Sequence, residues 1–181
     1  MKCVTLGILA MACGISILWT EPWIEAPQAV AKKALTEAEI RSDIQYQANL
    51  RAAKAVLNKK GCGEKIPAYA AQAAIRNHIP ARIVAADIVV ESGCRTNAKS
   101  KAGAIGLMQV MGSIYRVPRK RLLNPKENVN IGTRILAQKI HKYGYRGGLA
   151  RYFGLTPGSS ASAVYATKVL NIAYREKSYE R

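Results

Sequence analysis

The 181-residue sequence predicts an all-α fold for a domain that extends from about residue 36 to residue 176. Residues 36–39 and 124–127 both carry the capping signatures that begin helices. Apolar residues recur at helical spacing after each signature, and no alternating run of strand length is present. A chain of this length can bury one hydrophobic core of its own, so a single helical domain is expected.

The predicted helices are separated by proline and glycine residues. They lie between Thr36 and Gly61, after Pro67, over 81–92, from Pro125 to Gly144, around 149–153 and from about Ser159 onward. Thr36 and Glu39 form a capping box, and Asn124 caps a helix whose first residue is a proline. Glycine pairs are expected to separate the last short helices.

The helix over 81–92 is apolar nearly all round, which is typical of a helix buried at the centre of a domain. It nevertheless contains Asp87 and ends on Glu91-Ser92. Burial disfavours the ionised form of a carboxylic acid and raises its pKa. An acid that stays protonated near neutral pH is what cleavage of a glycosidic bond requires. On spacing alone, a structural glutamate is the commoner explanation.

Residues 1–31 are expected to be an export signal or an N-terminal membrane anchor, and residues 32–181 to be the domain. A basic start at Lys2 precedes an apolar run over 3–19, which is long for a signal peptide and short for a membrane span. Ala29-Val30-Ala31 offers a cleavage site at some distance from that run. Cleavage and anchoring in the inner membrane both stay open. The domain is expected in the periplasm or cell envelope, with membrane contact only through this segment.

The formal net charge of +17 indicates attraction to a polyanion. Basic residues are scattered along the domain, with one dense run at 116–121, so a nucleic-acid partner would rest on charge alone and is not expected. An anionic cell wall or membrane surface fits an exported protein better, with a merely solvated basic surface as the alternative. Cys62 and Cys94 are expected to form a disulfide in an oxidising compartment, with two buried thiols as the alternative. The two histidines lack metal-ligand spacing, and neither a metal nor another cofactor is expected.

Four motifs follow Glu91-Ser92 in order. They are Gly106-Leu107-Met108-Gln109, the stretch 123–132 with Asn-Pro and Asn-Val-Asn-Ile-Gly, Leu149-Ala150-Arg151-Tyr152, and Tyr165 to Val169. In kind and order they resemble the lytic transglycosylase family in its soluble-transglycosylase, goose-lysozyme-like form, in which a Glu-Ser pair precedes G-L-M-Q by about 15 residues. The resemblance covers roughly residues 68–175 and implies a compact lysozyme-like helical domain.

The resemblance implies a peptidoglycan lytic transglycosylase with Glu91 as its single acid/base catalyst. Glu91 would protonate the oxygen between N-acetylmuramic acid and N-acetylglucosamine, and would then accept the proton of the muramyl 6-hydroxyl as it closes a 1,6-anhydro ring. The acetamido group of the substrate would stabilise the intermediate, so no second carboxylate is required. Glycan strands are the implied partner. The small size resembles that of transglycosylases that open local gaps for secretion, conjugation or pilus systems.

The resemblance also assigns five substrate-binding or supporting residues, which are Ser92, Met108, Gln109, Tyr152 and Tyr165. Ser92 would orient the acetamido group, and Met108 and Gln109 would line the sugar subsite. Tyr152 would hydrogen-bond Glu91, and Tyr165 would line the groove or support that network. Structural alternatives stay open: Ser92 could satisfy the helix end, and Met108 and Tyr165 could be core residues.

Three positions depart from the family pattern. Phe153 stands where the family usually has Asn, and Ala161 removes a common groove carboxylate. Asp87 occupies a usually apolar position one helical turn before Glu91. Asp87 could raise the pKa of Glu91, or could point away and pair with a basic residue, which is the preferred interpretation. Two further functions stay open, a catalytically degenerate domain that binds glycan as a scaffold of an envelope-spanning machine, and a lysozyme that uses water in place of the 6-hydroxyl.

Overall fold

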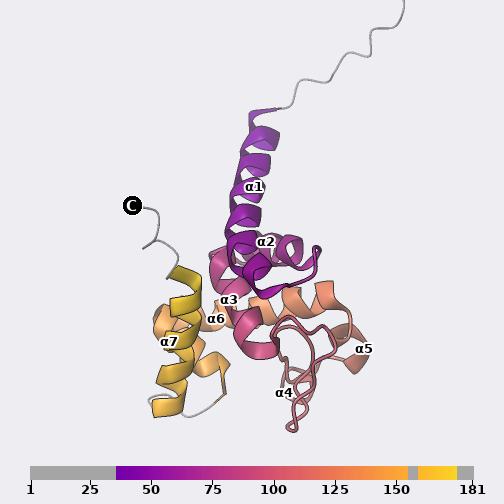
Figure 1. Cartoon of the computed structure of the whole chain (residues 1–181), viewed down its shortest axis with the longest axis vertical. Coiled ribbons are helices and arrows are strands. Elements are labelled where there is room, and N and C mark those ends of the chain that lie inside the picture. Colours follow the sequence, from indigo (N-terminus) through magenta and orange to yellow (C-terminus); the bar gives the residue numbers. More distant parts are fainter. Residues whose placement is uncertain (1–35, 155–158, 175–181) are drawn as a thin grey trace, which may run out of the picture. The chain divides into compact units, whose positions relative to one another are not determined.

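The structure of the protein, a computed structural model, describes residues 36–154 and 159–174 (Figure 1). Its elements are α1 (Glu37–Leu57), the 3-10 turn η1 (Asn58–Lys60), α2 (Ile66–Arg76), α3 (Ala81–Ser92), α4 (Gly112–Tyr115), α5 (Arg119–Leu122), α6 (Pro125–Tyr152) and α7 (Ser160–Tyr174). Extended pairing within these ranges is limited to isolated bridges at residues 99, 105 and 110. The predicted all-α class is confirmed. The expected signal or anchor segment lies outside the described residues.

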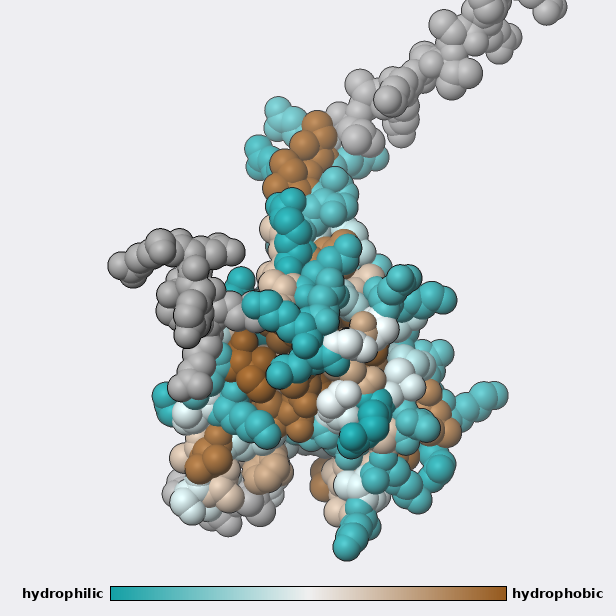
Figure 2. Space-filling model, in the orientation of Figure 1, coloured by the Kyte–Doolittle hydropathy of each residue, from teal (hydrophilic) through white to brown (hydrophobic). Residues whose placement is uncertain are grey.

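Helix α1 begins with the predicted capping box. The Thr36 hydroxyl accepts a hydrogen bond from the Glu39 amide at 3.2 Å, and the Thr36 amide donates to the Glu39 carboxylate at 2.7 Å. Only the C-terminal half of α1 is buried, where it packs against α2 and α3. Its first turns are exposed, and they form part of the apolar surface visible at the top of Figure 2. No helix in the described ranges has the length and apolarity needed to cross a membrane.

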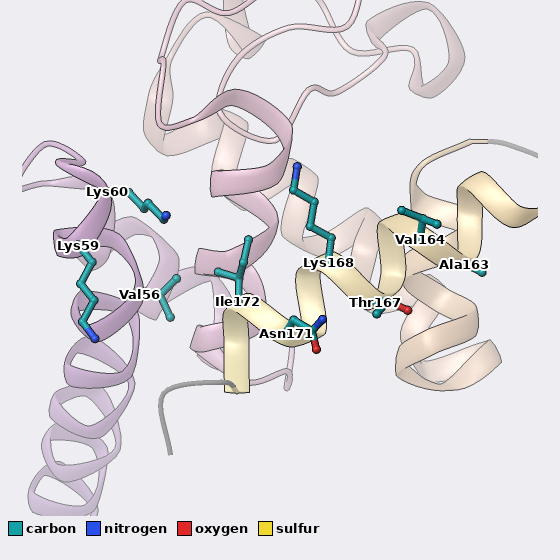
Figure 3. A pocket seen from close by; sticks show the side chains of 9 residues that line it. All are labelled: Val56, Lys59, Lys60, Ala163, Val164, Thr167, Lys168, Asn171 and Ile172. Carbon is teal, nitrogen blue, oxygen red and sulfur yellow. The ribbon is translucent and has the colours of Figure 1, made fainter. Parts of the chain in front are cut away.

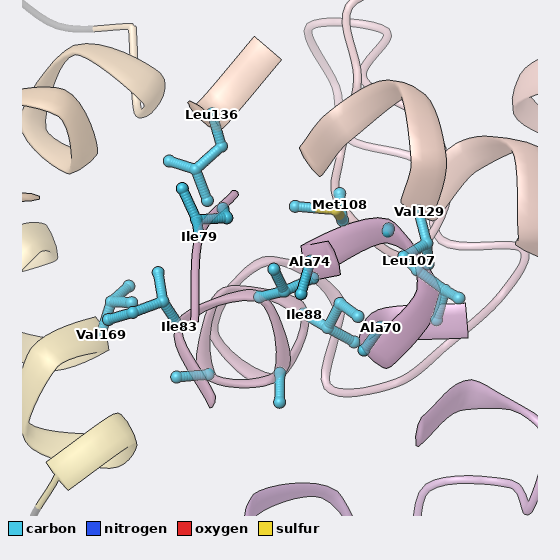
Figure 4. Close-up of a cluster of buried hydrophobic side chains, with 14 of the residues drawn as sticks. Ala70, Ala74, Ile79, Ile83, Ile88, Leu107, Met108, Val129, Leu136 and Val169 are labelled. Carbon is cyan, nitrogen blue, oxygen red and sulfur yellow. The ribbon is translucent and has the colours of Figure 1, made fainter. Parts of the chain in front are cut away.

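Helix α3 is the central element of the core. It packs against α1, α2 and α7, and its side chains from Ile83 to Ile88 are fully buried (Figure 4). Truncating a buried aliphatic residue such as Ile83 to Ala typically costs about 2–5 kcal/mol. The helix ends at Gly93, whose φ of 56° is the left-handed conformation that favours glycine at this position. Glu91 therefore stands in the last turn, where a buried helix reaches the surface.

The loop after α3 is held against α6 by one buried amide. The Asn128 side chain accepts from the Met108 amide at 2.9 Å and donates to the carbonyl oxygens of Ile105 at 2.8 Å and Leu122 at 3.0 Å. A Cβ on Gly106 would lie only 2.2 Å from the Asn128 amide, and one on Gly132 only 2.6 Å from Met108. The Gly-Leu-Met-Gln segment and the Asn-Ile-Gly segment of α6 are therefore complementary surfaces of one contact.

Helix α6 differs from the prediction at its C-terminal end. The helix was expected to end at Gly144, with a short separate helix after Gly147-Gly148. The helical geometry does break at Gly144, with φ 69° and ψ 172°, but the chain is helical on both sides of it, Gly147 and Gly148 included. Gly148 instead permits close packing, because a Cβ there would lie 2.6 Å from the Ile140 backbone. The short helices α4 and α5 were not predicted, since one helical turn is too short to show periodicity.

The predicted disulfide between Cys62 and Cys94 is confirmed. Its two Cα atoms lie 5.4 Å apart. It joins the segment between η1 and α2 to the turn that follows α3, so the chain on both sides of the central helix is covalently tied.

Candidate active site

Two large hollows are present among the described residues. The larger, of about 740 Å³, lies between the end of α1 with η1 and helix α7 (Figure 3). Its lining residues are Val56, Lys59, Lys60, Ala163, Val164, Thr167, Lys168, Asn171 and Ile172. The lining is mainly aliphatic and lysine side chains and contains no carboxylate, so this hollow offers no carboxylic acid for general acid catalysis.

The second hollow, of about 660 Å³, contains Glu91 and is called here the Glu91 groove. The loop 100–111, helix α4 and helix α6 form its walls. Its polar lining includes Gln109, Tyr115, Lys139 and Arg151, together with Tyr152. A single acid thus faces a groove that carries basic and aromatic side chains, which is a suitable lining for a polar, anionic polymer.

Glu91 is only partly exposed, and its Oε1 accepts a hydrogen bond from the Tyr165 hydroxyl at 2.5 Å. Burial raises the pKa of Glu91 above its ordinary value of 4.5, while the hydrogen bond from Tyr165 works in the opposite direction. The net upward shift keeps a proton on Glu91 at pH values where an exposed glutamate has lost it. The groove therefore holds a potential general acid.

Asp87 does not pair with a basic residue, and the preferred interpretation of its position was wrong. Its side chain is fully buried, and its Oδ1 lies 2.7 Å from the Tyr165 hydroxyl oxygen. Position 87 is on the inward side of α3, where none of the described lysines or arginines forms an ion pair with it. Burial first, and then the nearby Glu91, raise the pKa of Asp87 well above its ordinary value of 3.8.

Of the two site tyrosines, Tyr165 and not Tyr152 hydrogen-bonds Glu91. Tyr152 was predicted to hydrogen-bond Glu91, but its hydroxyl donates to the Met108 carbonyl at 2.7 Å while its ring lines the groove. Tyr165, which was expected to line the groove or support the network, is buried behind Glu91 and contacts it directly. The reason is that Tyr152 ends α6 beside Gly132, where the Gly-Leu-Met-Gln loop packs, and so reaches the loop backbone.

Ser92 and Met108 take their structural alternatives rather than groove positions. The Ser92 hydroxyl donates to the Ile88 carbonyl at 3.0 Å inside the core. Met108 is fully buried, and its sulfur accepts from the Thr133 hydroxyl at 3.4 Å. Neither residue lines the Glu91 groove. Both stabilise the elements that carry the groove.

Gln109 lines the groove as expected, in a constrained backbone conformation. Its φ is 44°, which is uncommon for a residue with a side chain. Its side-chain amide donates to the carbonyl oxygens of Gly106 at 2.9 Å and Ala98 at 3.3 Å. These bonds fix the tip of the loop and hold the Gln109 side chain at the groove wall.

Three features of the site were missed from the sequence. The sequence motif that contains Asn128 was noted, but the role of its side chain in holding the Gly-Leu-Met-Gln loop was not foreseen. Lys139 and Arg151 line the groove from α6, and only their helical register could have indicated this. Phe153 was noted only as a departure from a pattern, and its ring contact with α7 was not foreseen. Within the described ranges, no three His, Cys, Asp or Glu residues are grouped so that they could hold a metal ion.

An all-helical domain with a partly buried glutamate at the edge of a groove has the general acid that a glycan-cleaving, lysozyme-like domain requires. Residues 68–175 match the model of the transglycosylase SLT domain, and the chain belongs to this family. A similar solved structure is the lytic transglycosylase Slt from Pseudomonas aeruginosa, crystallised as an inactive mutant in which a glutamate is replaced by glutamine. It is 21% identical with a TM-score of 0.51, and the match covers 59% of this chain and 23% of that chain. The present chain therefore corresponds to about a quarter of that larger protein.

Proposed function

We propose that the protein is a peptidoglycan lytic transglycosylase in which Glu91 is the only acid/base catalyst. The observation that carries the proposal is the position of Glu91, a partly buried acid with a raised pKa at the wall of a groove large enough for sugar rings. Membership of the transglycosylase SLT family supports the choice of peptidoglycan as substrate. The inactive Glu-to-Gln mutant of the similar Slt structure supports a glutamate as the catalyst.

In the first step Glu91 acts as an acid. Its proton moves to the oxygen that links N-acetylmuramic acid to N-acetylglucosamine, and the electron pair of the breaking bond to the anomeric carbon goes to that oxygen. The acetamido group of the muramyl residue compensates the positive charge that develops at the anomeric carbon. Glu91 is left as a carboxylate that still accepts the hydrogen bond from Tyr165.

In the second step the same residue acts as a base. The muramyl 6-hydroxyl attacks the anomeric carbon, a new carbon–oxygen bond forms, and the hydroxyl proton moves to Glu91. The product is a 1,6-anhydro end, and Glu91 returns to its protonated state without consuming water. The enzyme needs only one acid for this cycle, and within the described ranges Glu91 is the only carboxylate that lines the groove.

The groove lining supports a glycan strand with anionic substituents. Lys139 and Arg151 both line the wall that α6 provides, and Tyr152 and Tyr115 offer aromatic surface to sugar rings. We assign Gln109 and Tyr152 as substrate contacts. Tyr165 serves as a supporting residue. Ser92 and Met108 lose the substrate contacts expected of them, because both are buried away from the groove.

The proposed place of action is the cell envelope, after export through residues 1–31 as a cleaved signal or as an inner-membrane anchor. The small domain suits local opening of the wall for a secretion, conjugation or pilus apparatus. The alternative of a non-catalytic, glycan-binding scaffold was based on Phe153 and Ala161, which depart from the family pattern. Phe153 packs on Tyr165 and so supports the Glu91 network, which weakens that alternative.

Product analysis of purified sacculi tests the proposal. Wild-type protein should release fragments with anhydro ends, and Glu91→Gln should bind sacculi but lose about 10²–10⁴-fold of the cleavage rate, because the transferable proton is gone. Mass spectrometry separates the outcomes, since a lysozyme gives reducing ends that are one water heavier. A wild-type protein that binds sacculi without releasing fragments would identify the scaffold. A Glu91→Gln variant with activity within about threefold of wild type would remove Glu91 as the catalyst.

A further inference from the structure

Asp87 is a fully buried acid for which the proposed reaction has no role, although it lies one helical turn from Glu91. We propose that Asp87 is a positioning residue that stays protonated and donates to the Tyr165 oxygen, so that the Tyr165 hydroxyl points its own proton at Glu91. This inference rests on the proposed role of Glu91 as the catalyst. It adds a second acid to the site, one that never touches the substrate.

The Tyr165 hydroxyl contacts both Asp87 and Glu91 but has only one hydrogen to donate. The Tyr165 oxygen lies 2.5 Å from Glu91 Oε1 and 2.7 Å from Asp87 Oδ1, both within hydrogen-bond distance. A tyrosine hydroxyl has one hydrogen and can donate only once. The second contact is a hydrogen bond only if the other carboxyl group is protonated and donates to the tyrosine oxygen. At least one of the two acids therefore carries a proton.

The surroundings of the two carboxyl groups decide which one holds that proton. Asp87 has no exposed surface, and its Oδ2 is buried without a hydrogen-bond partner. An ionised Asp87 would leave charged lone pairs unsatisfied, whereas a neutral Asp87 with its hydrogen on Oδ1 leaves only a carbonyl oxygen. Glu91 instead reaches the groove, where solvent or substrate can compensate a charge. The pKa of Asp87 is raised chiefly by burial, in agreement with this assignment.

The neighbouring elements bring no charge that would ionise Asp87. The buried residues of α1 and α2 are all apolar. Helix α7 contributes Tyr165, and the end of α6 contributes Tyr152, whose pKa values are both raised well above 10.0, first of all by burial. The basic side chains that line the groove, Lys139 and Arg151, face the groove and not the interior. The buried carboxyl group thus faces neutral partners and Glu91 alone.

The hydrogen bonds from Asp87 to Tyr165 and from Tyr165 to Glu91 determine which oxygen of Glu91 carries the transferable proton. The Tyr165 hydrogen occupies Glu91 Oε1 and leaves Oε2 to carry that proton. When that proton moves to the leaving oxygen, the new carboxylate already accepts the Tyr165 hydrogen, and only one negative charge remains in the pair. An ionised Asp87 would instead leave two adjacent carboxylates at this stage, which is costly in a buried site.

Infrared spectroscopy tests the protonation state without relying on activity. In a Glu91→Gln background, Asp87 is the buried carboxyl group that remains at the site. The carbonyl band of a protonated carboxylic acid should be present at pH 7 in this variant and absent after Asp87→Asn is added. Absence of the band in Glu91→Gln would overturn the proposal. If Glu91→Gln shows the band while the wild-type protein never cleaves sacculi, the proposed function is refuted and the assignment of the Asp87 proton stays intact.

Two neutral substitutions of Asp87 then distinguish a hydrogen-bond donor to Tyr165 from a residue that only fills the core. Asp87→Asn keeps a donor, so its kcat should stay within about threefold of wild type, with little change in the pH at which kcat falls. Asp87→Leu is neutral and of similar size but cannot donate, so kcat should fall about three- to tenfold at unchanged KM. Equal kcat in both variants would exclude the donor role. A downward shift of the alkaline limb by about one pH unit in Asp87→Asn would show that Asp87 had been ionised beside Glu91.

Discussion

The ring of Phe153 stacks on the ring of Tyr165, with centroids 4.6 Å apart and planes inclined by 21°. This contact joins Phe153, which follows α6 and lines the Glu91 groove, to α7. Stacked aromatic pairs contribute about 0.5–1.5 kcal/mol beyond the area that they bury. The residue that departs from the family pattern thus fixes the tyrosine that contacts Glu91, and the substitution has a structural role of its own.

Tyr165→Phe should lower kcat about 10–100-fold, because one hydrogen bond to a group that becomes charged in the reaction is lost. The stacking on Phe153 should persist, since the ring is retained. KM should change little, because Tyr165 does not line the groove. Initial rates of fragment release from sacculi would measure the effect.

Tyr152→Phe is the matched control, because it removes a hydroxyl that bonds the Met108 carbonyl and not Glu91. It should lower stability by about 1 kcal/mol and affect kcat less than Tyr165→Phe. A larger loss of kcat in Tyr152→Phe than in Tyr165→Phe would contradict the observed network.

The protein should lose stability as the pH rises above about 4. A carboxyl group whose folded pKa is raised contributes its full stabilisation below its unfolded pKa, and loses it as the pH rises toward the folded value. The ordinary value of Asp87 is 3.8, and burial raises its pKa well above this in the folded protein. The free energy of unfolding should therefore decrease by about 1.4 kcal/mol per pH unit for this group.

Urea unfolding at several pH values would measure this slope, with Asp87→Asn as the comparison. The variant lacks the titrating group, so its stability relative to wild type should rise with pH between pH 4 and neutrality. Parallel curves for the two proteins would show that the pKa of Asp87 is not raised by folding.

The sequence was sufficient to predict much of the fold, because several signals were local. Capping by Thr36 and Asn124 depends on residues a few positions away, and both caps are present. The burial of α3 followed from its composition. The break at Gly144 was predicted as the end of a helix. The helical conformation of Gly147 and Gly148 was not predicted, because the close packing of Gly148 on Ile140 is not visible in the local sequence.

The catalytic candidate was predictable from motifs, but its contacts were not. Which tyrosine meets Glu91 depends on how α6 and α7 pack, and no spacing along the chain encodes that. The environment of Asp87 was misjudged for a similar reason. The net charge of +17 suggested that a basic residue would pair with Asp87. Asp87 instead faces α7, which contributes Tyr165.

Replacing Cys62 and Cys94 by serine should destabilise the domain by about 2–4 kcal/mol, because the open chain gains entropy when it unfolds. The two residues are 32 positions apart and their bridge ties down the turn after α3. Chemical unfolding of the oxidised protein and the double variant would measure the difference. Cys3 and Cys13 lie within residues 1–31, so the check uses the protein without that segment. Titration of two thiols in this oxidised, denatured protein would refute the bridge.

The basic run at 116–121 should strengthen binding to sacculi without affecting chemistry. Arg116, Arg119 and Lys120 are exposed, whereas Arg121 is paired with Glu127 at 2.5 Å. Replacing the three exposed residues with Gln should weaken sacculus binding, as added salt does, because exposed charges are screened beyond about 8 Å at physiological ionic strength. Turnover of a short, uncharged glycan should change much less.

Substituting Arg51, Lys54 and Lys65 with Gln removes the same charge from exposed sites outside the groove and separates a local patch from net charge. If salt and the substitutions at 116–120 depress turnover of both substrates equally, the charges belong to the active site or the fold. The envelope-binding interpretation would then be wrong.

The kink at Gly144 sets the direction of the last two turns of α6 relative to the rest of the helix. The combination of φ 69° and ψ 172° is a conformation that only glycine adopts freely, so one pair of torsions sets this direction. Arg151 and Tyr152 belong to these last turns, and both line the groove. The width of the groove on this side is therefore fixed by a backbone hinge that lies away from Glu91 in the sequence. A small rotation there would move Arg151 and Tyr152 relative to Glu91, and would also act on Tyr165 through its ring contact with Phe153.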